Sequence, residues 1–231
     1  MKKIVVLTGA GISAESGIKT FRDDDGLWRT HRFEELATPQ AWNNNPRLVL
    51  DFYNERRKQL FKCEPNEGHR ALVRLEQYFH VDIITQNVDD LHERAGSTNV
   101  LHLHGELRKA RSTTDPQLIY TLSHWDLKLG DRCEKGSQLR PHIVWFGEAV
   151  PNIAKAIQIT KKADLLIVIG TSLQVYPAAS LLDYTSSSIP VYLIDPKANA
   201  PSHLRNIITI HENATTGVSK IVQEIIQSTQ Q

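Results

Sequence analysis

Short, continuous apolar runs recur along the chain, and each is followed by small or polar residues. They span residues 4–7, 165–169 and 190–194, and residues 81–84 form a similar run that is apolar except for Asp82. Continuous apolar strands separated by helical patterns indicate a parallel sheet that is covered on both faces. A stripe at helical spacing near the carboxyl end predicts one covering helix: Val218, Ile221, Val222, Ile225 and Ile226. The pattern therefore predicts an α/β fold.

The first apolar run opens directly into a glycine-rich turn. Gly9, Gly11 and Ala14 satisfy the G-x-G-x-x-G/A spacing of a pyrophosphate site. We interpret Gly9 as allowing a tight turn, Gly11 as letting the backbone approach phosphates, and Ala14 as keeping the next helix close to the sheet. The N-terminus of that helix would then face the anion. A plain strand-to-helix connector is the alternative interpretation.

The residues after this turn differ from those of a Rossmann dehydrogenase. Such enzymes carry an acidic residue about 20 positions on, at the end of a second strand. Here residues 21–28 read Phe-Arg-Asp-Asp-Asp-Gly-Leu-Trp, which is polar and turn-like. We therefore expect a loop over the ligand, and hydride transfer is the least favoured chemistry.

Polar side chains follow the second apolar run, where residues 85–92 read Thr-Gln-Asn-Val-Asp-Asp-Leu-His. Polar groups at the carboxyl end of a parallel strand lie where open α/β sheets bind ligands. The alternative is an ordinary turn in which Asp89 caps the next helix. Farther on, strand alternation places His102 and His104 on one face. Spacing alone makes neither histidine catalytic, since most such residues are structural.

Together these segments resemble the sirtuin (Sir2) family of NAD-dependent protein deacylases. The matching motifs are GAGISAESGI at 9–18, FR at 21–22, GLW at 26–28, TQN-x-D-x-LH-x-x-AG at 85–96, HG at 104–105 and RPH-x-V-x-FGE at 140–148. The resemblance runs from Lys3 to about residue 215. It implies a Rossmann-like NAD-binding domain with a small inserted lobe. The domain would comprise residues 1–28, 62–105 and 142–231, and the lobe residues 29–61 and 106–141.

The resemblance also implies a reaction. The oxygen of an acyl-lysine would attack the nicotinamide ribose C1′, giving deacylated lysine, nicotinamide and O-acyl-ADP-ribose. His104 precedes Gly105 as the family's catalytic histidine does, and it would act as general base on the ribose hydroxyls. That step needs a neutral imidazole, which the ordinary histidine pKa near 6.5 provides. Asn87 and Asp89 would hold the ribose and the nicotinamide carboxamide, whereas His102 is interpreted as structural.

Further residues are expected at the site by the same resemblance. Phe21 and Arg22 would close over the cofactor, and Asp195, where the family commonly has Asn, would accept from the adenine ribose hydroxyls. The expected NAD-binding residues are Gly9, Ala10, Gly11, Ser13, Gly17, Phe21, Arg22, Trp28, Gln86, Gly170, Thr171, Ser172, Asp195 and Ala214. Residues 140–148 would pair with an extended peptide, and the expected contacts are Val144, Phe146, Gly147 and Glu148. The other interpretation of this segment, which is compatible with the first, is a core strand with Trp145 and Phe146 buried.

The acyl group is predicted from a helix that Asn45 and Pro46 would open. Its apolar stripe would comprise Val49, Phe52, Tyr53, Arg56 and Leu60, while Arg57 and Lys58 would lie off it. Tyr53-x-x-Arg56 resembles the pair by which desuccinylating sirtuins recognise acidic acyl chains. Since a guanidinium binds a carboxylate through two parallel hydrogen bonds, we expect succinyl-lysine or malonyl-lysine to be preferred over acetyl-lysine. The alternative is that the Arg56 side chain reaches solvent or pairs with a carboxylate of the chain.

The main departure from the family lies between His104 and Arg140. Most sirtuins hold a structural zinc there through two cysteine pairs, whereas this segment offers Cys133 alone. Ligation that joined His124 and Asp126 to it would be a poor zinc signature. We therefore expect no metal, and an apolar cluster that holds the lobe instead: Leu118, Ile119, Tyr120, Leu122, Trp125, Leu127 and Leu129.

Composition favours a cytoplasmic enzyme. The 231 residues are 40% hydrophobic, enough for one large domain and a small lobe. A net charge of +1 argues against nucleic-acid binding through a basic surface, and no apolar run reaches transmembrane length. The only two cysteines, Cys63 and Cys133, indicate a reducing compartment. We expect acyl-lysine proteins or peptides as partners, neither nucleic acid nor membrane, and leave the oligomeric state open.

Two other functions stay open. A mono-ADP-ribosyltransferase would use the same C1′ electrophile with a protein side chain as acceptor. A non-catalytic module that senses NAD or ADP-ribose would need no base, so the joint presence of His104, Asn87 and Asp89 argues against it.

Overall fold

The computed structural model describes residues 2–19, 33–200 and 206–228. Three predicted site residues, Phe21, Arg22 and Trp28, lie outside the described residues. Within the described ranges, no helix combines the length and the apolar character needed to cross a membrane.

A six-stranded parallel sheet forms the larger part of the molecule, as the apolar runs predict. Its strand order is β3-β2-β1-β7-β8-β9. The strands are β1 (Lys3–Thr8), β2 (His80–Thr85), β3 (Val100–His102), β7 (Leu165–Ile169), β8 (Val191–Ile194) and β9 (Ile207–Ile210). In this order β1 lies between β2, which follows it in sequence, and β7, which comes much later. The order in which the chain adds strands therefore reverses at β1. Ligands bind at such switch points in open α/β sheets.

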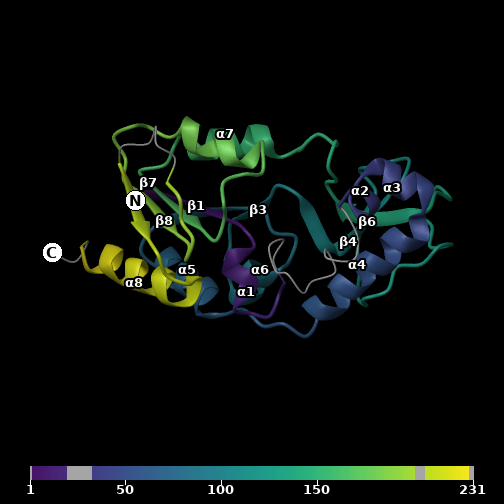
Figure 1. Cartoon of the computed structure of the whole chain (residues 1–231), viewed down its shortest axis with the longest axis horizontal. Coiled ribbons are helices and arrows are strands. Elements are labelled where there is room, and N and C mark those ends of the chain that lie inside the picture. Colours follow the sequence, from purple (N-terminus) through teal and green to yellow (C-terminus); the bar gives the residue numbers. More distant parts are fainter. Residues whose placement is uncertain (1, 20–32, 201–205, 229–231) are drawn as a thin grey trace.

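Helices cover both faces of this sheet (Figure 1). On one face α5 (Glu67–Glu76) packs against α8 (Ala214–Gln227), and on the other lie α7 (Ile153–Thr160) and the 3-10 helix η2 (Ala178–Tyr184). Alternate side chains of β1 pack into the cores on the two faces of the sheet. Ile4 and Val6 belong to the core under α5 and α8, whereas Val5 and Leu7 belong to the core under α7. The predicted Rossmann-like fold is therefore confirmed.

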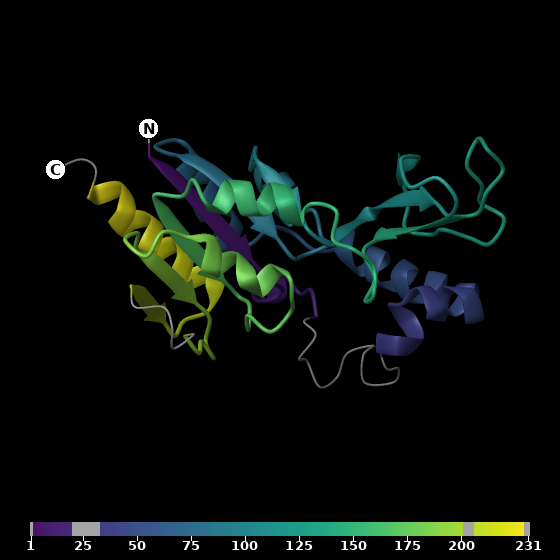
Figure 2. The same ribbon diagram turned by 90° about the horizontal axis from the view of Figure 1, so that it is seen from above.

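The remaining elements lie together at one end of the molecule, as two views at right angles show (Figures 1 and 2). They are α2 (Phe33–Leu36), α3 (Pro39–Asn44), α4 (Pro46–Leu60), β4 (Gly105–Ser112), β5 (Ile119–Thr121) and β6 (Leu139–Ile143). The strands form a separate antiparallel sheet in the order β5-β4-β6. We call this end the small lobe; the residue boundaries expected for it stay a prediction. Two short helices, α1 (Gly11–Ala14) and α6 (Leu91–Ala95), lie beside the large sheet.

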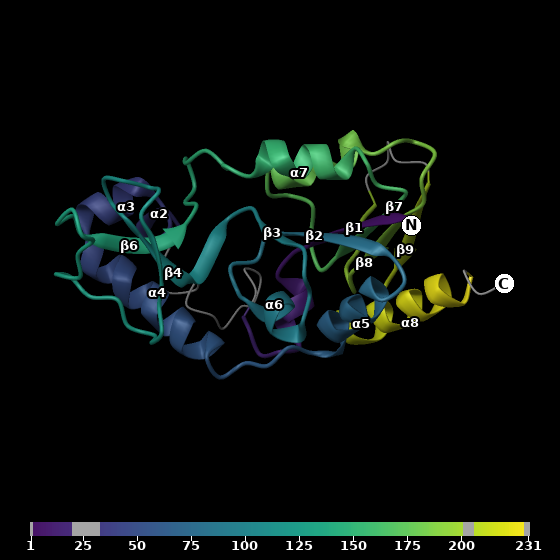
Figure 3. The ribbon, with the colours of Figure 1, turned by 180° about the vertical axis from the view of Figure 1, so that it is seen from behind.

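Helix α4 begins as predicted and lies along the small sheet (Figure 3). The Asn45 side chain accepts a hydrogen bond from the Leu48 N–H at 3.1 Å, and Pro46 occupies the first turn. Val49, Phe52, Tyr53 and Leu60 are buried, so most of the predicted apolar stripe is correct.

Arg57 contradicts the expectation that it lies off the buried face, because its exposed fraction is 0%. Its Nη1 donates to Asn54 Oδ1 at 2.9 Å and to the Trp125 carbonyl at 2.6 Å, and its Nε donates to the Leu107 carbonyl. These two carbonyls lie on β4 and in the loop after β5, where buried backbone acceptors need donors. A guanidinium supplies several donors from one side chain, so Arg57 joins α4 to the small sheet.

The apolar cluster of the small lobe is smaller than predicted. Leu122 and Leu127 are buried together with Leu50, Cys133 and Leu139, and Leu118 and Tyr120 are partly buried against them. Ile119, Trp125 and Leu129, which were expected in the cluster, are exposed. Ile119 belongs to a short edge strand, and Trp125 contributes its carbonyl to Arg57 rather than its ring to the core.

Candidate active site

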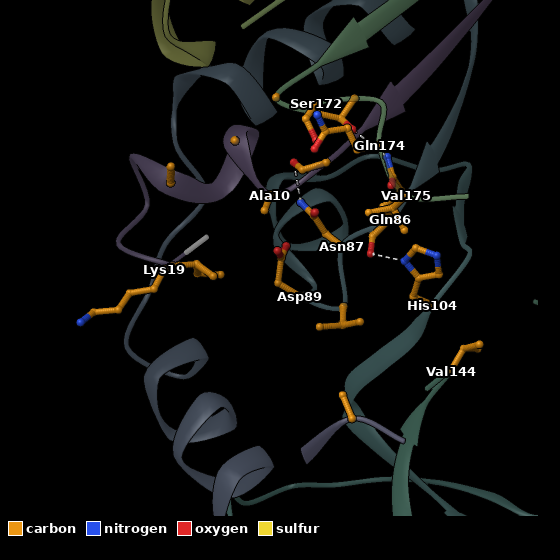
Figure 4. A pocket seen from close by; sticks show the side chains of 18 of the residues that line it. Ala10, Lys19, Gln86, Asn87, Asp89, His104, Val144, Ser172, Gln174 and Val175 are labelled. Carbon is orange, nitrogen blue, oxygen red and sulfur yellow. Dashed lines mark hydrogen bonds between the residues drawn. The ribbon is translucent and has the colours of Figure 1, made fainter. Parts of the chain in front are cut away.

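A cavity of 690 Å³ opens at the carboxyl ends of β1, β2 and β7 and extends to the small lobe. The strand register explains its position: Thr8 pairs with Thr85 on one side and with Ile169 on the other, so three loops leave the sheet at one level. Figure 4 shows Asn87, Asp89 and His104 facing this cavity, with Val144 beyond His104.

Most of the predicted site residues line the cavity. They are Gly9, Ala10, Gly11, Tyr53, Arg56, Gln86, Asn87, Asp89, His104, Val144, Phe146, Gly147, Glu148, Gly170, Thr171, Ser172, Asp195 and Ala214. Two do not line it. Ser13 is buried just behind the wall, and Gly17 lies away from it, with its carbonyl accepting from Gln59 Nε2 at 2.7 Å.

The first turn packs against a second glycine turn, which follows β7, so closely that its glycines leave no room for a side chain. The Gly11 N–H donates to the Gly170 carbonyl at 2.8 Å. A Cβ on Gly9 would lie 2.7 Å from the Gly170 oxygen, and one on Gly11 would lie 2.5 Å from the Gly170 Cα. Both glycines therefore permit two loops to touch. Ala14 does not hold a helix to the sheet as predicted, because α1 is only four residues long and Ala14 is exposed at the cavity.

The loop after β2 holds Asn87 and Asp89 in fixed positions. Asn87 Nδ2 donates to the Gly9 carbonyl at 3.1 Å and to Ser13 Oγ at 3.3 Å. Asp89 accepts from Ser13 Oγ at 3.0 Å and from the Leu91 N–H at 3.1 Å. The second contact lies at the start of α6, so the capping interpretation of Asp89 is also partly correct. Burial raises the pKa of Asp89, while the Leu91 N–H and the Ser13 hydroxyl oppose that shift.

A layer of neutral polar side chains lies beneath this loop. Thr8 Oγ1 donates to Thr85 Oγ1 at 2.8 Å and lies 3.0 Å from His92 Nε2. His69 Nε2 lies 3.5 Å from Ser13 Oγ. Burial lowers the pKa of His69 to about 4 and that of His92 far below its usual value, so both rings are neutral near pH 7. Sequence reasoning missed this layer, although His92 belongs to the quoted motif at 85–96 and Asn66, three residues before His69, signals a helix cap.

His104 has one nitrogen fixed and one available. Its Nδ1 lies 3.0 Å from the Gln86 carbonyl, which can only accept, so this nitrogen carries the proton. Nε2 then has a lone pair, and it has no hydrogen-bond partner among the described residues. Burial lowers the pKa of His104, which favours the neutral ring. The arrangement suits a general base.

The segment after β6 is held by a partly buried ion pair. Glu148 accepts from Arg140 Nη1 at 2.7 Å and from the Trp145 N–H at 2.8 Å. Burial opposes ionisation of Glu148, but the hydrogen bonds from Arg140 lower its pKa overall. Of the two aromatic residues predicted to be buried, Trp145 is 2% exposed, whereas Phe146 is 42% exposed and lines the cavity. The turn that Glu148 closes explains why neighbouring rings point in different directions.

Tyr53 and Arg56 lie at the small-lobe end of the cavity. The Tyr53 hydroxyl accepts from Trp145 Nε1 at 3.2 Å, which leaves its own proton for another acceptor. Burial raises the pKa of Tyr53 to about 12, so it stays a phenol. Burial also lowers the pKa of Arg56, because a low-dielectric site disfavours the cation.

The zinc site of most sirtuins does not fit the residues of the small lobe. The Cys133 thiol is buried and donates to Ser112 Oγ at 3.5 Å, while His124 is exposed beside Asp126. Across the part of the chain that is described, no three His, Cys, Asp or Glu side chains are grouped so as to hold a metal ion. A structural zinc needs four ligands in tetrahedral geometry.

Sequence reasoning also missed part of the cavity wall. Gln174, Val175 and Tyr176 line it after β7, and Lys19 and Lys197 line it as well. Gln86 Nε2 donates to Thr171 Oγ1 at 3.1 Å and so links the loops after β2 and β7. The signal for the first three was their place just beyond the turn at 170–172.

A glycine-lined cavity at the switch point of a parallel sheet defines a nucleotide-binding class of α/β protein. The sequence model of the Sir2 family matches residues 9–177. A Helicobacter pylori protein named NAD-dependent protein deacylase is 56% identical over 227 residues, covering 98% of this chain and 99% of that protein. A Bacteroides thetaiotaomicron protein of the same name is 51% identical over 231 residues, covering 98% and 99%. The chain belongs to the Sir2 family.

A solved structure agrees with this assignment. A Sir2 homologue in complex with NAD superposes with a TM-score of 0.89 at 40% identity, covering 98% of this chain and 90% of that one.

Proposed function

We propose that this protein is an NAD-dependent deacylase that acts on protein lysines and releases nicotinamide and O-acyl-ADP-ribose. The observation that carries the proposal is the convergence of Asn87, Asp89 and a neutral, fixed His104 on one glycine-lined cavity. Support comes from the deacylase names of the relatives and from the NAD complex of the similar structure.

The turn at Gly9 to Gly11 and the turn at 170–172 would hold the diphosphate, and Asp195 would accept from the adenine ribose. Bound NAD supplies an electrophilic ribose carbon and nicotinamide as leaving group. Asn87 and Asp89 would hold the nicotinamide ribose and the carboxamide. His104 would accept a ribose hydroxyl proton at Nε2 while Nδ1–H stays on the Gln86 carbonyl. His104 would thus take up one proton at Nε2 while its contact with the Gln86 carbonyl stays unchanged.

The peptide would lie along the segment at 144–148. The contact of Arg140 with Glu148 holds this segment and its turn beside the cavity. Backbone pairing binds a peptide with little dependence on its sequence. The acyl-lysine would then enter between Val144 and Phe146 toward His104.

We further propose that acidic acyl chains, succinyl or malonyl, are preferred over acetyl. A carboxylate reaching the small-lobe end would meet the Arg56 guanidinium and the Tyr53 O–H. Burial penalises the Arg56 cation, and an anionic acyl group offsets that penalty. The acetyl group has no atom that could make these contacts.

The decisive experiment incubates the purified protein with NAD and matched peptides that carry acetyl-, malonyl- or succinyl-lysine, followed by mass spectrometry. Loss of the acyl group with formation of O-acyl-ADP-ribose supports the function. A peptide or protein that instead gains ADP-ribose would identify a mono-ADP-ribosyltransferase, and NAD binding without any product would identify a sensing module.

Arg56→Met tests the acyl preference. It should lower kcat/KM for the succinyl peptide by about 10- to 100-fold, in line with about 1.5–3 kcal/mol for hydrogen bonds to a charged group. Activity on the acetyl peptide should change little. Arg47→Met, on an exposed position of the same helix, is the matched control. Equal losses on both peptides would refute the preference and leave the deacylase proposal intact.

A further inference from the structure

His102 lies behind the cavity wall, at the end of β3, and is 8% exposed. Its Nδ1 lies 3.0 Å from the Asn87 carbonyl oxygen, and its Nε2 lies 2.8 Å from Glu93 Oε1 in α6. A carbonyl and a carboxylate are both acceptors. Only the imidazolium, which has an N–H on each nitrogen, can donate to both. Either neutral tautomer would turn a lone pair toward an oxygen.

His104 differs in this respect, although it lies only two residues away. It meets one acceptor, the Gln86 carbonyl, and a neutral ring satisfies that contact. The carbonyls of Gln86 and Asn87 are consecutive, so the two histidines hold neighbouring peptide groups of one loop. One histidine does so as a neutral ring and the other as a cation.

We propose that His102 is a positioning residue whose imidazolium form holds the Asn87 loop, and that loss of its proton sets the alkaline limit of catalysis. The inference rests on the proposed role of Asn87 in holding the ribose. Asn87 is otherwise fixed by its N–H on Thr85 Oγ1 at 3.0 Å and by its side chain on the Gly9 carbonyl. A repulsive contact at its carbonyl would displace the side chain, and a misplacement of about 1 Å can lower a rate about 100-fold.

The charged groups around His102 favour its cation. Glu93 from α6, Glu106 from β4 and Asp89 from the loop all interact with it, and His92 beside Glu93 is neutral. Burial alone would lower the pKa of His102, but the hydrogen bond that it donates to Glu93 and the charge of that carboxylate raise it overall. Asn152, at the start of α7, donates to the His102 carbonyl at 2.8 Å and fixes its backbone.

The sign of the pH effect follows from these contacts. The pKa of His102 is raised, so the clamp is present at low pH and is lost as pH rises through that pKa. The pKa of His104 is lowered, so the base is lost as pH falls through it. Activity should therefore fall at both low and high pH. The decline at high pH should come from deprotonation of His102, a residue that does not touch the substrate.

The test compares kcat and kcat/KM between about pH 5 and 10 for the parent protein and Glu93→Gln. The glutamine amide can donate to His102 Nε2, so the neutral ring satisfies both neighbours while Nδ1–H stays on Asn87. We expect the parent to lose at least about tenfold at the alkaline end and Glu93→Gln less than about twofold. Asp82→Asn is the matched control, because Asp82 pairs with His80 at 3.2 Å at the far end of β2. An unaltered alkaline limb in Glu93→Gln, or none in the parent, would overturn the proposal.

Two more measurements separate this inference from the proposed function. Nitrogen NMR of the His102 ring at neutral pH should show both nitrogens protonated, and a lone pair on either would refute the clamp whether or not the protein is a deacylase. If no turnover were found, the NAD dissociation constant would replace it as the readout, rising at alkaline pH in the parent and not in Glu93→Gln. His102→Gln should lower kcat about tenfold or more with an unchanged unfolding midpoint. A lower midpoint with unchanged kcat would mark a merely structural residue.

Discussion

The two ends of the cavity are built in opposite ways. At the cofactor end, where NAD is proposed to bind, two glycine turns meet where three strands finish, and the histidines beneath them, His69 and His92, are neutral. At the acyl end, which is the small-lobe end where the acyl group is proposed to bind, the arginine side chains are buried and paired: Arg57 is held by carbonyls, and Arg140 by Glu148. NAD brings its own negative charge to the first end. At the second end the Arg56 guanidinium lines the cavity, and this positive charge is why selectivity for an acidic acyl group is proposed there.

The largest expected effect breaks the cofactor end. His104→Ala should lower kcat about 10³-fold, because general base catalysis typically contributes that much. The fold and the affinity for NAD should be largely unchanged, since the glycine turns and not His104 are proposed to hold the diphosphate. Steady-state kinetics and calorimetric titration with NAD provide the two readouts. A variant that retained activity within a few-fold of the parent would remove His104 from the mechanism.

The next effect breaks the small lobe without touching substrate. Arg57→Leu removes three hydrogen bonds: those to the Leu107 and Trp125 carbonyls, and that to Asn54 Oδ1, which keeps the Leu127 N–H as a donor. We expect the free energy of unfolding to fall by about 3 kcal/mol, at about 1 kcal/mol for each lost hydrogen bond. Arg47→Leu makes the same change on an exposed position of α4 and should cost under about 0.5 kcal/mol. Urea unfolding would measure both, and similar values would contradict the buried role of Arg57.

A smaller and more selective effect sharpens the acyl end. Tyr53→Phe keeps the ring contact with Phe52, whose centroid is 5.0 Å away, and removes only the hydroxyl. We expect kcat/KM for a succinyl peptide to fall about 5- to 10-fold, the equivalent of about one hydrogen bond. Activity on an acetyl peptide should stay within about twofold. The measurement is kcat/KM of the variant for both peptides. An equal loss on both would mean that the Tyr53 hydroxyl supports the folded structure and does not select the acyl group.

The smallest effect expected is none at all. Because the described residues of the small lobe form no group of metal ligands, treatment with a chelator should leave the unfolding midpoint unchanged, unlike in domains that depend on zinc. Elemental analysis should likewise find no stoichiometric zinc. One zinc per chain would contradict the proposal that Arg57 and the apolar cluster hold the lobe.

Features set by neighbours in sequence were predictable, and features set by distant partners were not. The apolar runs gave the strands, and Asn45 with Pro46 gave the start of α4. The burial of Arg57 depends on acceptors 50 and 68 residues away, which no spacing along α4 reveals. The closeness of Gly11 to Gly170 and the opposite orientations of Trp145 and Phe146 have the same origin. Sequence motifs were enough to find the candidate site. The histidines beneath it, His69 and His92, could be assigned to it only from the three-dimensional structure.

The pairing of β1 with β7 also bears on how the protein matures during synthesis. Lys3–Thr8 is made first, yet one of its two neighbours in the sheet is Leu165–Ile169. A nascent chain that has not reached this strand carries the first glycine turn without Gly170 to close it. Since pairings between distant segments form slowly, the cradle for the diphosphate is completed late. Binding of NAD should therefore require that the whole sheet has assembled. Free NAD would then stabilise only the completely folded protein.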